Sequence, residues 1–179
     1  MPPATPAEHV LREWVKAFNS GDSTRLGAYY RKYALQRSVE AMMQFRQQTG
    51  GFHLVSVERS DPRLIEFVLR EKNTGAQAMG VIELDPSNER RQRQSALRGI
   101  PPGASPAAFR IDAATRARVI DTAITRLRDN YVSPEVAARM ADAVRDRQKR
   151  GEYDDISNGM TFAGRLTENF RAVSKDRHL

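Results

Sequence analysis

Apolar residues in the first fifty positions recur every three or four residues, which is the period of an amphipathic helix. Val10, Trp14 and Phe18 are spaced four residues apart. Thr5-Pro6-Ala7-Glu8 precedes them in the order of a capping box, in which the threonine and glutamate side chains each accept a hydrogen bond from an unpaired main-chain amide. The pattern predicts a helix that begins at residue 6, ends within residues 19–22 and turns Trp14 inward.

Two more helices are predicted before residue 52. The second runs from residue 22 or 23 to about residue 33. The third runs from residue 38 to about residue 48, where Gly50-Gly51 stops it.

From residue 52 the apolar period changes to two, which is typical of a β-strand. Turn residues such as Asn73-Thr74-Gly75 separate the strand-like segments and favour an antiparallel connection. We expect four strands. The first starts at residue 52, and the others cover about residues 64–70, 77–84 and 91–97.

Three prolines and two glycines within residues 99–106 interrupt regular structure. We therefore expect a first domain over residues 1–98, a linker over 99–108 and a second domain over 109–179. Only helical periodicity follows the linker, with helices expected from Asp112 to about residue 130, from Ser133 to Gly151 and from about residue 161 to 173. The predicted fold class is α+β: N-terminal helices on an antiparallel sheet, then a small three-helix bundle.

The charge and composition exclude several classes of protein. The net charge of +7 is spread over both halves of the chain, and no nucleic-acid recognition motif accompanies the one basic run at Arg90, Arg91 and Arg93. A charged strand edge explains that run better, and nucleic-acid binding is the weakest of our alternatives. Cysteine is absent, which excludes disulfides and thiolate metal sites. Apolar stretches of four residues or fewer predict no membrane span.

The N-terminus has no export signal, so the chain either stays inside the cell or has lost its signal. The compartment stays open between the cytoplasm and the periplasm or extracellular space.

Residues 6–98 resemble the nuclear transport factor 2-like, or SnoaL-like, fold. The residues that carry the resemblance are Trp14-Val15-Lys16-Ala17-Phe18-Asn19-Ser20-Gly21-Asp22. The resemblance implies that the N-terminal helices pack into the concave side of a curved antiparallel sheet. It also implies a cone-shaped pocket that this fold often uses for small molecules.

Residues 109–179 resemble the helical segment before the catalytic core of tail-specific, or C-terminal processing, serine peptidases of the retinoid-binding-protein-like branch. The residues that carry this resemblance are Ile120-Asp121, Asn130-Tyr131-Val132-Ser133-Pro134-Glu135-Val136-Ala137, Gly151-Glu152-Tyr153 and Asp176-Arg177-His178-Leu179. In tricorn-like members a histidine in this region serves as general base to a serine that comes much later in the chain. The resemblance therefore implies a lead-in segment whose catalytic core has no counterpart in these residues.

The only catalytic candidate is His178, as the base of an incomplete site, although an exposed chain end explains it better. His9 and His53 are expected at the surface, and no metal motif or cofactor site is evident. The candidates for a ligand pocket are aromatic: Trp14, Phe18, Tyr29, Tyr30, Phe52 and Phe67. A packed core explains this set better than an open pocket, since helix and strand periodicity already accounts for it.

The leading hypothesis is a non-catalytic accessory region of a C-terminal processing serine peptidase, inactive alone, that serves docking, dimerisation or substrate presentation. Its expected partners are a missing peptidase core or a second copy of the chain. The alternative is a stand-alone protein of the nuclear transport factor 2-like class that binds a peptide or a small hydrophobic ligand.

Overall fold

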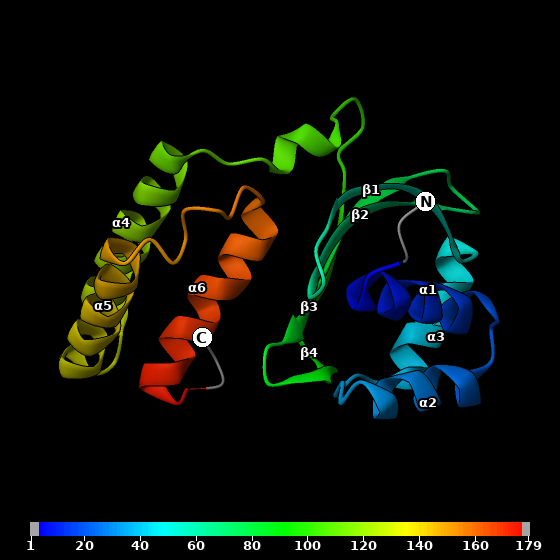
Figure 1. Cartoon of the computed structure of the whole chain (residues 1–179), viewed down its shortest axis with the longest axis horizontal. Helices are drawn as coiled ribbons and strands as arrows, with labels where there is room; N and C mark the ends of the chain where they lie inside the picture. Colours follow the sequence, from blue (N-terminus) through cyan, green and yellow to red (C-terminus); the bar gives the residue numbers. More distant parts are fainter. Residues whose placement is uncertain (1–3, 177–179) are drawn as a thin grey trace. The chain divides into compact units, whose positions relative to one another are not determined.

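The computed structural model describes residues 4–176, and the chain divides into two units, Met1–Pro106 and Ala107–Leu179 (Figure 1). Three helices, a four-stranded antiparallel sheet and three further helices follow one another along the described residues, which confirms the α+β class. None of the described helices is long and apolar enough to cross a membrane.

The three helices of the first unit begin at side-chain caps. They are α1 (Pro6–Asn19), α2 (Ser23–Lys32) and α3 (Val39–Thr49). Thr5 accepts a hydrogen bond from the main-chain amide of Glu8 at 3.2 Å, as the capping box predicts. The other half of the box does not form among the described residues, because the Glu8 carboxylate pairs with Arg12 one turn further on.

The sheet is an antiparallel meander in the order β1-β2-β3-β4. Its strands are β1 (Phe52–Ser60), β2 (Leu64–Glu71), β3 (Gln77–Asp85) and β4 (Asn88–Gly99). Irregularities in the register interrupt β1 against β2 and β3 against β4. The basic run that begins at Arg90 lies in β4, which is an edge strand, as the sequence predicts.

Helices α1 to α3 lie on one side of the curved sheet (Figure 1). Alternate residues of β2 face them, because side chains of a strand point in turn to opposite faces. Ile65, Phe67 and Leu69 are therefore buried in one apolar cluster with residues of α1 and α2 such as Leu11 and Leu26.

Asn19, the last residue of α1, joins this helix to the first strand. Its side-chain amide nitrogen donates to the Phe52 carbonyl oxygen at 2.8 Å, and its amide oxygen accepts from the Phe52 main-chain amide at 2.7 Å. The preceding residue, Gly51, has φ +94°, and a Cβ atom there would lie 2.5 Å from the Asn19 amide oxygen. Glycine is thus required at position 51 for the two hydrogen bonds to form.

A second asparagine secures the end of α3. The Asn73 side chain donates to the carbonyl oxygens of Gln47 and Gln48 at 3.2 and 3.0 Å, which caps the last turn of the helix from the β2–β3 turn. The Asn73 main-chain amide also donates to the Thr49 carbonyl oxygen at 2.9 Å. The two asparagines together attach the C-terminal ends of α1 and α3 to the same end of the sheet.

The second unit contains the helices α4 (Ala113–Asn130), α5 (Pro134–Lys149) and α6 (Gly159–Ser174). Helix α6 begins two residues before the expected start, because the Asn158 side chain accepts from the main-chain amides of Met160 and Thr161. This unit has its own apolar cluster, formed by Ile120, Ile124, Met140, Ala141, Val144, Tyr153, Ile156, Phe162, Leu166 and Phe170.

Replacement of Asn19 by alanine should lower the free energy of unfolding by about 2–4 kcal/mol, since it leaves a donor and an acceptor of Phe52 unpaired. Asn19→Asp keeps the acceptor but removes the donor, so we expect a smaller loss. Gln44→Ala, at an exposed position of α3, should change stability by less than about 0.5 kcal/mol. Urea unfolding followed by circular dichroism measures all three, and equal values for Asn19→Ala and Gln44→Ala would contradict the role of this side chain.

Candidate functional site

A cavity of about 390 Å³ lies between the helices and the sheet of the first unit. Small-molecule sites in proteins have volumes of roughly 300–1,000 Å³. The apolar part of its wall comes from α1, α3 and the strands β2 to β4, and consists mainly of Trp14, Met42, Phe45, Phe67, Ile82 and Leu97. Four of these six side chains are only partly buried, although they pack against the core cluster.

Of the six predicted aromatic residues, three line the cavity and three do not. Trp14, Tyr30 and Phe67 line the cavity. Phe18 and Phe52 lie behind its wall, with ring centroids 5.2 Å apart. The sixth residue, Tyr29, is buried on α2 and does not line this cavity.

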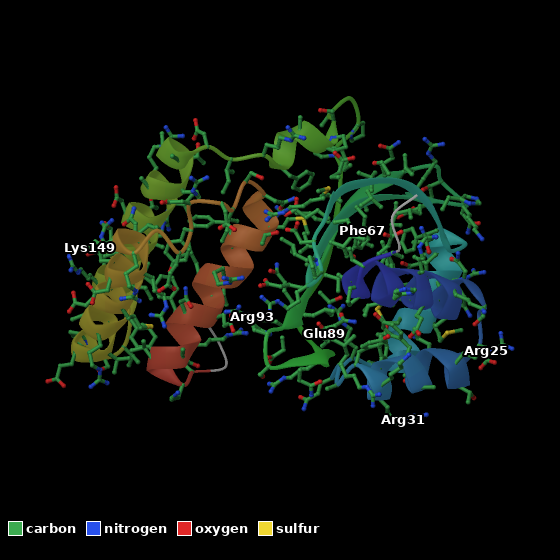
Figure 2. All side chains as sticks on the ribbon, viewed as in Figure 1. Arg25, Arg31, Phe67, Glu89, Arg93 and Lys149 are labelled. Carbon is green, nitrogen blue, oxygen red and sulfur yellow. The ribbon has the colours of Figure 1, made fainter. Side chains whose placement is uncertain are left out.

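Phe67, labelled in Figure 2, borders the cavity from the sheet. The position of its ring depends on a glycine on the neighbouring strand. Gly80 of β3 is its partner across the β2–β3 ladder. A Cβ atom on Gly80 would lie 2.2 Å from the Phe67 ring, so the ring occupies the space of a missing side chain. Glycine within a strand often marks such a close approach, and here it lets the phenyl ring lie against the sheet.

The Tyr30 hydroxyl is the most unusual polar group at the cavity. Tyr30 is 4% exposed, and its hydroxyl makes no hydrogen bond within the described residues. Burial raises the pKa of Tyr30, while the positive charge of Arg37 and the nearby Trp14 indole lower it in part. The indole does not reach hydrogen-bond geometry with the hydroxyl, so the hydroxyl has no hydrogen-bond partner within the described residues.

Three polar residues at the cavity wall were not predicted from the sequence: Arg37, Glu71 and Ser95. Arg37 lies in the loop between α2 and α3, and its guanidinium donates to the Ser95 main-chain oxygen. The Glu71 carboxylate at the end of β2 accepts from the Thr74 hydroxyl. None of the three belongs to a recognisable motif; the strands β2 and β4 place Glu71 and Ser95 at the cavity, and the α2–α3 loop places Arg37 there.

Tyr29 of α2 and Tyr33, which follows the last residue of this helix, have hydrogen-bond partners, in contrast to Tyr30. The Tyr29 hydroxyl accepts from the Gln92 side chain at 2.6 Å, and burial raises the pKa of Tyr29. The Tyr33 hydroxyl donates to Glu13 at 2.8 Å, and its pKa is raised by burial and by this bond. Burial alone would raise the pKa of Glu13, but hydrogen bonds from Lys32 and Tyr33 lower it.

The structure brings no serine together with a histidine among the residues that it describes. His178 lies outside the described residues. His9 and His53 are exposed, and no serine donates a hydrogen bond to either of them within residues 4–176. No group of three or more acidic or histidine side chains among the described residues is arranged to hold a metal ion.

The turn between α4 and α5 exposes an apolar side chain. The Tyr131 main-chain amide donates to the Leu127 carbonyl oxygen at 2.9 Å, and the Tyr131 hydroxyl donates to the Asp176 carboxylate at 3.3 Å. Pro134 begins the next helix. Val132, between them, is 93% exposed, which is the largest exposure among the exposed large apolar residues described.

The helical unit matches one known family model. Residues 111–179 match the family model of the N-terminal domain of Peptidase_S41 in eukaryotic IRBP. This match confirms the predicted peptidase N-terminal segment, and it contains all of α4, α5 and α6. No curated protein and no solved structure matches the chain.

The buried tyrosines predict alkaline destabilisation. The pKa values of Tyr29, Tyr30, Tyr33 and Tyr153 are raised, in each case mainly by burial. Their contribution to stability is present below the unfolded-state pKa of about 10 and is lost as the pH rises from there toward the folded-state values. We expect loss of helical circular dichroism above about pH 10 to accompany tyrosinate absorbance at 295 nm. Full tyrosinate absorbance with an unchanged dichroism spectrum would contradict this coupling.

Proposed function

We propose that this chain is a non-catalytic N-terminal region of a C-terminal processing serine peptidase, and that its second unit docks on the catalytic domain. The match of residues 111–179 to a peptidase N-terminal domain carries the proposal. The separate apolar cluster of this unit supports it, because a bundle with its own core can present a defined surface to a partner.

The α4–α5 turn is the surface that we propose for docking. Val132 contributes almost no burial within the chain, since it is 93% exposed. Complete burial of a valine side chain on a partner is favourable by about 1.5–3 kcal/mol. The hydrogen bonds of Tyr131 hold the residue before Val132, so one side of the turn is already ordered before a partner binds.

Val132→Asp should weaken binding to the catalytic domain of a C-terminal processing serine peptidase, prepared without its own N-terminal helices, by at least about tenfold. Val119→Asp is the matched control, since Val119 is 40% exposed on α4 and lies away from the turn. Its dissociation constant should stay within about threefold of the wild-type value.

Isothermal titration calorimetry measures both affinities, and circular dichroism checks that both variants are folded. No binding of the wild-type chain would disprove the docking proposal as a whole. Equal losses for the two variants would assign docking to a surface other than the turn.

A second candidate function is the binding of a small hydrophobic ligand by the first unit, in line with its resemblance to the nuclear transport factor 2-like fold. The cavity of about 390 Å³ favours this function, and Tyr30, whose buried hydroxyl has no hydrogen-bond partner within the described residues, is one of its lining residues. The two candidates are compatible, because every residue that lines the cavity belongs to the first unit and the peptidase match lies in the second.

A further inference from the structure

We propose that the cavity of the first unit holds a monocarboxylate with an elongated apolar body, and that the carboxylate lies beside Arg37 and Tyr30. The proposal rests on the second candidate function above, and it adds the chemical class and the orientation of the ligand. It is based on the shape of the cavity, on two hydrogen-bond donors at one end and on a carboxylate at the other.

The cavity is elongated along β4. Ser95 and Gly99 of β4 both line it. Ser95 pairs with Ile82 and Gly99 with Ala78, and these two residues line the cavity from β3. The four-residue spacing between Ser95 and Gly99 corresponds to roughly 13 Å along a strand. A volume of about 390 Å³ spread over that length suits a narrow, extended molecule better than a compact ring system.

The Ser95 end provides the donors. Among the described residues, the Ser95 carbonyl oxygen is the one hydrogen-bond acceptor that the Arg37 guanidinium contacts, so this group of five N–H donors keeps capacity for a ligand. The Tyr30 hydroxyl is buried and has no partner within the described residues, so a small rotation of the side chain toward the cavity would add a second donor. The Leu35 main-chain amide donates to the Tyr30 carbonyl oxygen at 2.9 Å, which holds the loop that carries Arg37 against α2.

A carboxylate fits these two donors better than a neutral acceptor does. Hydrogen bonds to an ionised oxygen are about twice as strong as those between neutral groups. Arg37 also supplies a positive charge, and both Arg37 and Tyr30 line the cavity. A carboxylate would satisfy a hydroxyl that is otherwise buried without a partner.

The opposite end of the cavity rejects a second negative charge. Glu71 lines the cavity and lies two residues beyond Leu69 on β2. Leu69 pairs with Ala78, and Ala78 pairs with Gly99, so Glu71 lies at the Gly99 end of the cavity. Its carboxylate accepts from the Thr74 hydroxyl. Two carboxylates in a partly buried site repel one another, so a dicarboxylate of the same length is excluded while an apolar chain end is accepted.

Three ten-carbon compounds test the class and orientation of the ligand: decanoate, 1-decanol and decanedioate. Trp14 is the single tryptophan of the chain and lines the cavity, so its fluorescence reports binding. We expect saturable binding of decanoate, with a dissociation constant at least about tenfold below those of 1-decanol and decanedioate.

Two variants test the proposed head-group contacts. Arg37→Gln should weaken decanoate binding by at least about tenfold and leave 1-decanol binding unchanged, because it removes the charge from an exposed side chain. Tyr30→Phe should weaken decanoate binding about threefold or more without loss of thermal stability, since no protein group loses a partner. Arg31→Gln is the matched control, at an exposed arginine of α2 that does not line the cavity (Figure 2), and it should leave all three affinities unchanged.

The possible outcomes separate this proposal from the function on which it rests. Equal binding of decanoate and 1-decanol, with no effect of Arg37→Gln, would overturn the carboxylate while ligand binding by the cavity stands. Saturation by none of the three compounds would overturn both. Preferred binding of decanedioate would overturn the orientation, because Glu71 would then not repel the far end of the ligand.

Discussion

Two hydrogen bonds between the Asn19 side chain and the Phe52 backbone hold the first helix on the sheet of the first unit. Asn19 pairs with both the donor and the acceptor of Phe52, so the end of α1 lies at a fixed distance from the first residue of β1. Trp14 and Phe18, on the same helix, then stack on Phe52, with ring centroids 6.0 and 5.2 Å from that of Phe52. The wall of the cavity therefore depends on this junction, because Trp14 belongs both to the stacked group and to the cavity lining.

Periodicity predicted the helices and strands of the chain because burial imposes it directly. An amphipathic helix repeats every 3.6 residues and a half-buried strand every two, and both periods can be read from one sequence. The errors lie at element ends, where individual side chains decide. Helix α6 begins at Gly159 because Asn158 caps it, and Glu8 pairs with Arg12 rather than completing a capping box.

The candidate site was predictable only in part. Trp14, Tyr30 and Phe67 could be predicted as inward-facing aromatics, but periodicity shows which face is buried and not whether that face is filled. The cavity depends on long-range geometry, such as the approach of the Phe67 ring to Gly80. Arg37 gave no sequence signal, because a loop residue acquires its position from the segments on either side of it.

The contrast among the tyrosines of α2 links the cavity to the stability of the first unit. Tyr29 and Tyr33 have hydrogen-bond partners on neighbouring elements, whereas the buried Tyr30 hydroxyl has none within the described residues. A buried polar group without a partner costs about 1–3 kcal/mol. A ligand acceptor would remove that cost, and a ligand that binds only the folded state adds about 2.7 kcal/mol of stability at a concentration one hundred times its dissociation constant.

This stabilisation would act on one unit of the chain. Every residue that lines the cavity lies in Met1–Pro106, so the free energy of ligand binding enters the unfolding equilibrium of that unit. The peptidase-like unit has a separate apolar cluster and contributes no residue to the cavity. The physical properties that support docking and those that support ligand binding therefore belong to different residues, and each can be changed by mutation without direct alteration of the other.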